Sequence, residues 1–147
     1  MDKSKTCFFT GHRKIAQSKI EIVKAHTFID GGALGFDTIA AETVIEMREK
    51  YQNIKLVMYL PCYGQSKMWK ESEQFRYRMV LSKADKIIYI TESVYTDDCM
   101  KLRNLKMIKD SSFCIAFCLM QKSGTGFTLR NAENVGIEIV NIADEIY

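Results

Sequence analysis

The sequence predicts an α/β protein, a Rossmann-like three-layer sandwich in which helices cover both faces of a mostly parallel, six-stranded sheet. Short apolar runs alternate with segments of helical periodicity along the whole chain, as expected for successive βαβ units. Residues 87–90 and 113–118 are apolar at consecutive positions, which is typical of strands buried on both faces. The chain is expected to form a single domain over residues 1–147, without an internal linker.

The six strands are expected to be short and mostly apolar. Gly11 follows the first strand, and Pro61, the only proline, closes the third because proline cannot donate to a sheet ladder. The strands are placed at residues 5–10, 27–30, 55–60, 86–90, 112–118 and 138–142.

Five helices are expected between these strands, each with one apolar face. They are placed at residues 16–25, 36–51, 67–84, 98–109 and 125–135. One face of the second helix is formed by Ile39, Ala40, Thr43, Val44 and Met47. The third helix is expected to bury the side formed by Met68, Trp69, Ser72, Phe75 and Met79.

The composition argues against a membrane protein, a secreted protein and a nucleic-acid-binding protein. No apolar run approaches the roughly 20 residues that cross a bilayer, and the first residues lack the long apolar stretch of a signal peptide, so a cytoplasmic protein is expected. The net charge of +3 is small, and basic residues are interspersed with acidic ones, which argues against a nucleic-acid surface.

The cysteine and histidine pattern does not favour a metal site. None of the five cysteines has CxxC spacing, and His12 and His26 are not spaced to join them. Neither a metal nor a cofactor is therefore expected. Cys62 and Cys99 fall in predicted loops, and the sequence leaves their reactivity open.

Two glycine-rich loops follow predicted strands and lead into predicted helices: DGGALGFDT at residues 30–38 and SGTGFT at residues 123–128. Ligands of doubly wound sheets bind at the carboxyl ends of the strands. Glycine lets a ligand approach the backbone, and a helix N-terminus offers unpaired N–H groups to a phosphate. An alternative is that the glycines serve only tight turns.

Side chains near the ends of the strands complete the expected anion site. The residues expected to contact a ligand are Thr10, Gly11, His12, Arg13, Gly31, Gly32, Ala33, Gly35, Asp37, Arg103, Asn104, Ser123, Gly124, Thr125, Gly126 and Thr128. Asp37 also stands where a helix N-cap belongs, so capping is the alternative for it. Trp69 and Phe75 are expected in the core rather than stacked on a base.

An ordered set of motifs gives the chain a family resemblance. The set comprises TGHR at 10–13, FIDGGALGFDTIAAE at 28–42, Pro61-Cys62, Gln65, Trp69, Cys99-Met100, Arg103-Asn104 and SGTGFT at 123–128. With these motifs the chain resembles the SLOG superfamily, named for the Smf/DprA and LOG proteins, and most closely its YpsA-like group of bacterial and phage proteins. The resemblance spans roughly residues 5–142.

The resemblance implies a Rossmann-like sheet with a pocket for a nucleotide or nucleotide-derived ligand. The superfamily includes phosphoribohydrolases, proteins that bind single-stranded DNA, and modules proposed to sense nucleotide signals. By this resemblance residues 31–35 form one wall of the pocket, and residues 123–128 match the phosphate loop of the hydrolases. Arg103 and Asn104 match an Arg-Lys pair whose arginine assists catalysis.

Departures from the hydrolase pattern favour a binding or sensor module over an enzyme. Leu129 and Arg130 stand where the hydrolases carry acidic residues, and a carboxylate would stabilise the positive charge that develops on the ribose. Asp30 replaces a small residue before the glycines.

The alternatives are a nucleoside-monophosphate phosphoribohydrolase, with Arg103 and either Asp37 or Glu133 as catalytic groups, and single-stranded DNA binding, which the small net charge disfavours. A homodimer that pairs through helices beside the pocket is expected from the resemblance and from the prevalence of two-fold assemblies.

Overall fold

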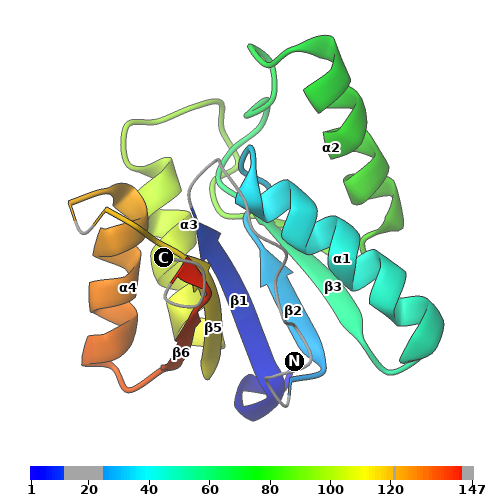
Figure 1. Ribbon diagram of the computed structural model, residues 1–147. Helices are drawn as coiled ribbons and strands as arrows, with labels where there is room; N and C mark the ends of the chain where they lie inside the picture. The colour runs from blue at the N-terminus through cyan, green and yellow to red at the C-terminus, as the bar shows by residue number, and fades with distance from the viewer. Residues whose placement is uncertain (12–24, 121, 144–147) are drawn as a thin grey trace.

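The computed structural model describes residues 1–11, 25–120 and 122–143 (Figure 1). Of the helix expected at residues 16–25, residues 16–24 lie outside these ranges. The sheet has six strands in the order β4-β3-β2-β1-β5-β6, and every neighbouring pair is parallel, which confirms the α/β prediction. The strands are β1 (Thr6–Gly11), β2 (Thr27–Asp30), β3 (Lys55–Leu60), β4 (Lys86–Tyr89), β5 (Phe113–Phe117) and β6 (Glu138–Asn141).

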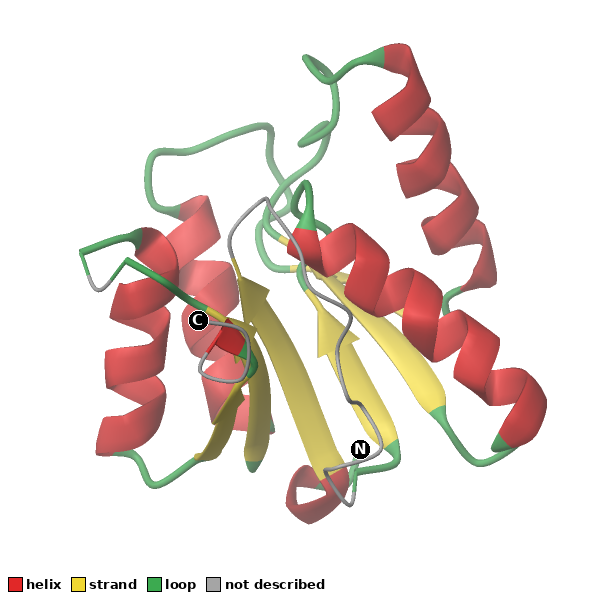
Figure 2. Cartoon of the chain, viewed as in Figure 1, coloured by secondary structure: helices red, strands yellow, loops and turns green. Residues whose placement is uncertain are grey.

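Within the described ranges, four α-helices flank the sheet in two layers (Figure 2). They are α1 (Phe36–Lys50), α2 (Glu71–Lys83), α3 (Cys99–Asp110) and α4 (Gly124–Asn134), and a short 3₁₀ helix, η1 (Lys3–Lys5), precedes β1. The strands β2, β3 and β4 follow one another outwards on one side of β1. After β4 the chain passes through α3 and adds β5 and β6 on the other side of β1. Because βα crossovers are right-handed, this reversal places α1 and α2 on one face and α3 and α4 on the other.

The central strands bury side chains on both faces, which explains their consecutive apolar positions. Phe9 and Phe28 pack beneath α1 with ring centroids 5.8 Å apart, whereas Phe8 and Ile29 pack against α3 and α4. Phe36, the first residue of α1, lies on the end of β1. A Cβ atom at Gly11 would come within 2.6 Å of the Phe36 ring, so glycine is required there for α1 to approach the sheet.

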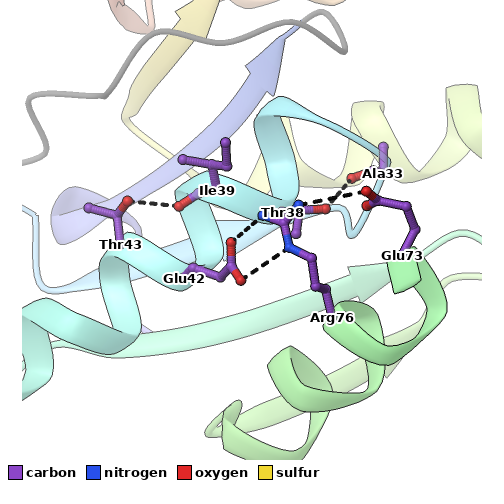
Figure 3. A network of polar contacts seen from close by, with 7 residues as sticks. All are labelled: Ala33, Thr38, Ile39, Glu42, Thr43, Glu73 and Arg76. Carbon is purple, nitrogen blue, oxygen red and sulfur yellow. Dashed lines mark hydrogen bonds and ion pairs between the residues drawn. The ribbon is translucent and has the colours of Figure 1, made fainter. Parts of the chain in front are cut away.

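An ion pair joins α1 to α2 (Figure 3). Arg76 donates from Nη2 to Glu42 Oε1 at 2.5 Å, and its Nη1 lies 3.7 Å from Glu73 Oε1 in the same helix. Within and before α1, Thr43 donates to the Ile39 carbonyl and Thr38 donates to the Ala33 carbonyl. The second of these bonds ties the helix to the loop that precedes it.

The prediction for the third helix is wrong in its start and in its buried face. The helix α2 begins at Glu71 rather than at residue 67. Met68 is 89% exposed, Phe75 57% and Met79 42%, whereas Val80 is the α2 residue that is buried. The helix packs against α1 and makes few contacts with the strands, so it has little core to meet.

This arrangement predicts that substitutions at two nearby α2 residues have very different effects on the free energy of unfolding. Phe75→Ser should change the free energy of unfolding by less than about 0.5 kcal/mol, because the ring is mostly in solvent already. Val80→Ala should cost about 2 kcal/mol through lost apolar contacts. Urea unfolding monitored by circular dichroism measures both changes. A larger loss for Phe75→Ser than for Val80→Ala would contradict the observed face.

None of the helices in the described ranges is long and apolar enough to span a bilayer.

Candidate ligand-binding site

A pocket of about 610 Å³ opens at the carboxyl ends of the strands. Its lining comes from the last residue of β1, from the segments that follow β2, β3 and β5, and from the first turn of α3. The residues are Gly11, Ala33, Leu34, Gln65, Trp69, Met100, Met120, Ser123, Gly124 and Thr125. The chain leaves β1 on one side towards β2, and β5 lies on its other side. The pocket therefore lies at the switch point of the sheet, where α/β proteins place their ligands.

One wall of the pocket is the N-terminus of α4. Ser123 caps this helix, since its Oγ accepts a hydrogen bond from the Gly126 amide at 3.1 Å. The amides of Gly124 and Thr125 belong to the first turn, where the helix supplies no acceptor. A Cβ atom at Gly124 would meet nothing within 4 Å, so this backbone faces open space. These amides and the partial positive charge of the helix end suit an anion.

A second wall is apolar and aromatic. Leu34, Met100 and Met120 line it together with Trp69, whose ring meets Tyr77 edge-on at 5.2 Å between centroids. Trp69 is half-buried and belongs to the turn before α2, so the expectation that it is a core residue is wrong. An aromatic plane thus lines the same cavity as the N-terminus of a helix.

The first glycine loop is held from below by a buried arginine. Arg103 of α3 is 6% exposed and donates from Nη1 to the Gly31 carbonyl at 2.6 Å and from Nε to Asn104 Oδ1 at 2.8 Å. A Cβ atom at Gly31 would come within 2.5 Å of Nη1. Gly31 is therefore small because the guanidinium fills the space next to it.

Two buried carboxyl groups occupy amides of the same loop. Asp30 Oδ1 accepts a hydrogen bond from the Gly32 amide at 2.8 Å, and Asp37 Oδ2 accepts one from the Ala33 amide at 3.1 Å. The loop amides at Gly32 and Ala33 therefore differ from the bare donors that the sequence led us to expect. Asp37 is not the helix cap, because Gly35 holds that position and α1 has no side-chain cap.

Positive backbone angles explain two of the remaining glycines. Gly32 has φ of 69° and Gly35 has φ of 86°, a region that side chains with a Cβ atom rarely adopt. Together with the Arg103 contact at Gly31, this accounts for all three glycines of the loop by conformation and packing. The backbone that is open to the pocket is instead the segment from Ser123 to Thr125.

The comparisons with known proteins agree with this architecture. The chain matches the model of the family described as "YspA SLOG family" over residues 12–135. The chain belongs to the YspA SLOG family. UPF0398 proteins of Bacillus cereus strains B4264 and ATCC 14579 are each 35% identical to it over 98 residues, and a UPF0398 protein of Bacillus thuringiensis strain Al Hakam is 34% identical over 98 residues. Each match covers 66% of this chain and 53% of the relative, so the chain spans about half the length of these relatives.

In this YspA SLOG protein, burial shifts the titration of the two loop carboxyls. Loss of solvent raises the pKa of Asp37 to about 6, and the positive charge of Arg103 and the Ala33 amide oppose that rise. The pKa of Asp30 is raised well above its usual value, first by burial and then by the neighbouring charge of Asp37. The cluster of Asp30, Asp37 and Arg103 lies beneath the loop, and its members do not line the pocket.

The other residues predicted for the site divide into three groups. Gly11, Ala33, Ser123, Gly124 and Thr125 line the pocket. Thr10, Gly126 and Thr128 are buried, and Thr128 donates to the Gly124 carbonyl at 3.0 Å, so it supports the helix start. His12 and Arg13 lie outside the described residues.

Glu133, the other catalytic candidate, is exposed in the last turn of α4. That turn is at the opposite end of the helix from Gly124. Asn104 is half-buried and accepts from Arg103. The structure therefore does not bring Glu133 and Arg103 together at the pocket.

Several lining residues carried little sequence signal. Leu34, Met100 and Met120 have apolar side chains without a polar or reactive group, so nothing in the sequence identified them as lining a pocket. Gln65 and Trp69 stood out only through the family motifs. Gln65 donates from Nε2 to the Tyr77 hydroxyl at 3.2 Å and to the Gly31 carbonyl at 3.4 Å, so it links the turn before α2 to the glycine loop.

The five cysteines are all unpaired and buried, including Cys62 and Cys99 near the site. Among the described residues, no group of three or more His, Cys, Asp or Glu side chains is arranged to hold a metal ion.

Proposed function

We propose that this protein binds a nucleotide or a nucleotide-derived phosphorylated ligand in the pocket at the switch point, as a binding or sensor module. The observation that carries the proposal is the pairing of two walls in one cavity. The first turn of α4 offers the open amides of Gly124 and Thr125, and Trp69 offers an aromatic surface. A phosphate on the first wall and a base on the second would use both.

The volume of the cavity supports a ligand of this size. Ligand pockets for small molecules typically measure about 300–1,000 Å³ and combine an apolar lining with a few placed polar groups. The pocket of about 610 Å³ lies within that range. Gln65 and Ser123 supply polar side chains beside the apolar lining, which suits the hydroxyl groups of a sugar.

We propose binding without catalysis because the charged groups that a hydrolase would need do not lie in the pocket. The position after the phosphate loop is Leu129, which packs into the core beside α3 and α4, and the next residue, Arg130, is exposed. Arg103 is engaged with Gly31 and Asn104 beneath the loop. No carboxylate of the described residues lines the pocket to stabilise an oxocarbenium-like transition state.

Trp69 provides a direct test, because it is the only tryptophan of the chain. Titration with nucleoside mono- and diphosphates should change its fluorescence in a saturable manner, since a bound base would alter the surroundings of the ring. In Trp69→Phe the optical signal should vanish, and calorimetry should report weaker binding, because a phenyl ring offers a smaller surface to a base.

Chromatography of the same mixtures shows whether the base is released. Release of free base from a nucleoside monophosphate would establish the hydrolase alternative and overturn the binding module. If neither fluorescence nor calorimetry detects any of these compounds at millimolar concentration, the nucleotide proposal fails.

A further inference from the structure

Asp30 is a buried acid, and one of its two carboxyl oxygens has no hydrogen-bond partner among the described residues. It ends β2 with no exposed surface, and its Oδ1 accepts the Gly32 amide at 2.8 Å. Its Oδ2 is buried and has no hydrogen-bond partner among the residues that the structure describes. Buried polar atoms of folded proteins are nearly always partnered, so this one requires an explanation.

The charged neighbours of Asp30 do not neutralise it. From α1 the carboxyl of Asp37 faces it, and from α3 comes the guanidinium of Arg103. The hydrogen bonds of Arg103 go to the Gly31 carbonyl and to Asn104, and within the described ranges no ion pair joins it to Asp30. Tyr77 and Cys62 also lie within the field of Arg103, and both are protonated at neutral pH because their pKa values are raised.

The cluster of Asp30, Asp37 and Arg103 can have both carboxyl groups ionised or one of them protonated, and the balance of charge favours the second state. With both carboxyls ionised, one guanidinium would face two buried negative charges. An unpaired buried carboxylate is far more costly than a buried neutral acid, and a second carboxylate nearby adds to that cost. Protonation of Asp30, which has no exposed surface and has the unpartnered oxygen, leaves one positive and one negative charge in the cluster.

We propose that Asp30 is uncharged in the folded protein and acts as a positioning residue, holding the Gly32 amide while Arg103 balances Asp37. This inference extends the proposed function. It rests on that function in one respect, namely that the loop after Asp30 forms part of the ligand pocket. Burial and the charge of Asp37 both raise the pKa of Asp30, in agreement with this assignment. Asp30 thereby fixes the backbone that presents Ala33 and Leu34 to the cavity.

A neutral Asp30 gives a pH dependence of stability opposite to that of an acid that is ionised and paired in the folded state. Its pKa is raised on folding, so the folded state holds a proton that the unfolded state releases above about pH 4. The stability contributed by this proton is fully present below the unfolded pKa and is lost as the pH rises through the folded pKa. Over that interval the equilibrium constant for unfolding should rise by about tenfold per pH unit for this one proton.

The decisive variant is Asp30→Asn, measured by urea unfolding between about pH 4.5 and about pH 7. Asparagine keeps an oxygen for the Gly32 amide and places an uncharged group at Oδ2. We expect the variant to be at least as stable as the wild type at neutral pH. Its pH slope should be smaller by about one proton. Asp30→Ala should be less stable than Asp30→Asn, because the Gly32 amide loses its acceptor.

The matched control is Asp85→Asn. Asp85 pairs with Arg48 at 2.7 Å and accepts the Leu56 amide at 2.8 Å, so unlike Asp30 it has a cationic partner. Removal of its charge should lower stability at neutral pH, opposite to the expectation for Asp30→Asn. If Asp30→Asn also lowers stability at neutral pH and leaves the pH slope unchanged, Asp30 is ionised and the proposal is wrong.

Infrared spectroscopy of the wild type tests the same point without relying on the stability of a variant. The carbonyl band of a protonated carboxylic acid should persist at neutral pH and should be missing from Asp30→Asn. Absence of that band from the wild type would overturn the proposal. The two proposals fail separately, because the charge of Asp30 is read from unfolding and infrared spectra, and the ligand is read from Trp69 fluorescence.

Discussion

Arg103→Met should lower the free energy of unfolding by about 3–5 kcal/mol at neutral pH, because it leaves a buried carboxylate without its positive partner. The guanidinium balances Asp37 and donates to the Gly31 carbonyl, and methionine does neither. Urea unfolding at about pH 7 measures this loss. The exposed residue Arg78 supplies the control, since Arg78→Met should change stability by less than about 0.5 kcal/mol.

The pH dependence of the Arg103→Met variant provides a second criterion. Loss of the positive charge raises the pKa of Asp37 further above about 6, so Asp37 takes up a proton more readily in the variant. The destabilisation should therefore shrink as the pH falls below about 6, where Asp37 becomes neutral in both proteins. A loss that is the same at about pH 5 and about pH 7, or one below about 1 kcal/mol, would show that Arg103 does not balance a buried charge.

Gly124→Glu should weaken binding of a phosphorylated ligand by at least about tenfold while leaving the fold intact. A Cβ atom at this position would meet no other atom within 4 Å, and Gly124 lines the pocket. The added carboxylate would compete with the ligand for the amides at the start of α4. A negative charge in the first turn is also favourable for the helix itself, so stability should not fall.

The matched control is Gly124→Ala, which adds a methyl group without charge. Trp69 fluorescence titrations should give a small change for alanine and a large one for glutamate. Thermal unfolding of all three proteins verifies that the fold is kept. Equal affinity for the glutamate variant and the wild type would place the phosphate elsewhere and contradict the assignment of the α4 N-terminus.

The sheet could be predicted from the sequence because its strands are short apolar runs buried on both faces. Their alternation with helical segments was enough to indicate parallel pairing. The face of α2 could not be predicted, because periodicity shows that apolar residues share a side and not whether a core lies beneath it. Phe75 and Met79 line a groove between α1 and α2, where the rest of the chain leaves them largely exposed.

For the candidate site, the sequence indicated two loops that both contribute to the pocket lining, but not the reason for the glycines of the first loop. The glycines at residues 31, 32 and 35 suggested bare backbone for a ligand. The guanidinium that fills the space beside Gly31 comes from a residue 72 positions away, and no local pattern reveals such a contact. The apolar lining from Met100 and Met120 was hidden for the same reason, since its members meet only after the chain has folded.

The bond from Arg103 to the Gly31 carbonyl also constrains the order of assembly. A nascent chain that has emerged as far as β3 already contains the glycine loop and its flanking strand, yet the group that holds this loop in shape is still to be synthesised. The opposite wall, at the start of α4, is translated later still. The proposed recognition of a ligand therefore requires the chain through the start of α4, because a fragment that ends earlier lacks one wall of the pocket.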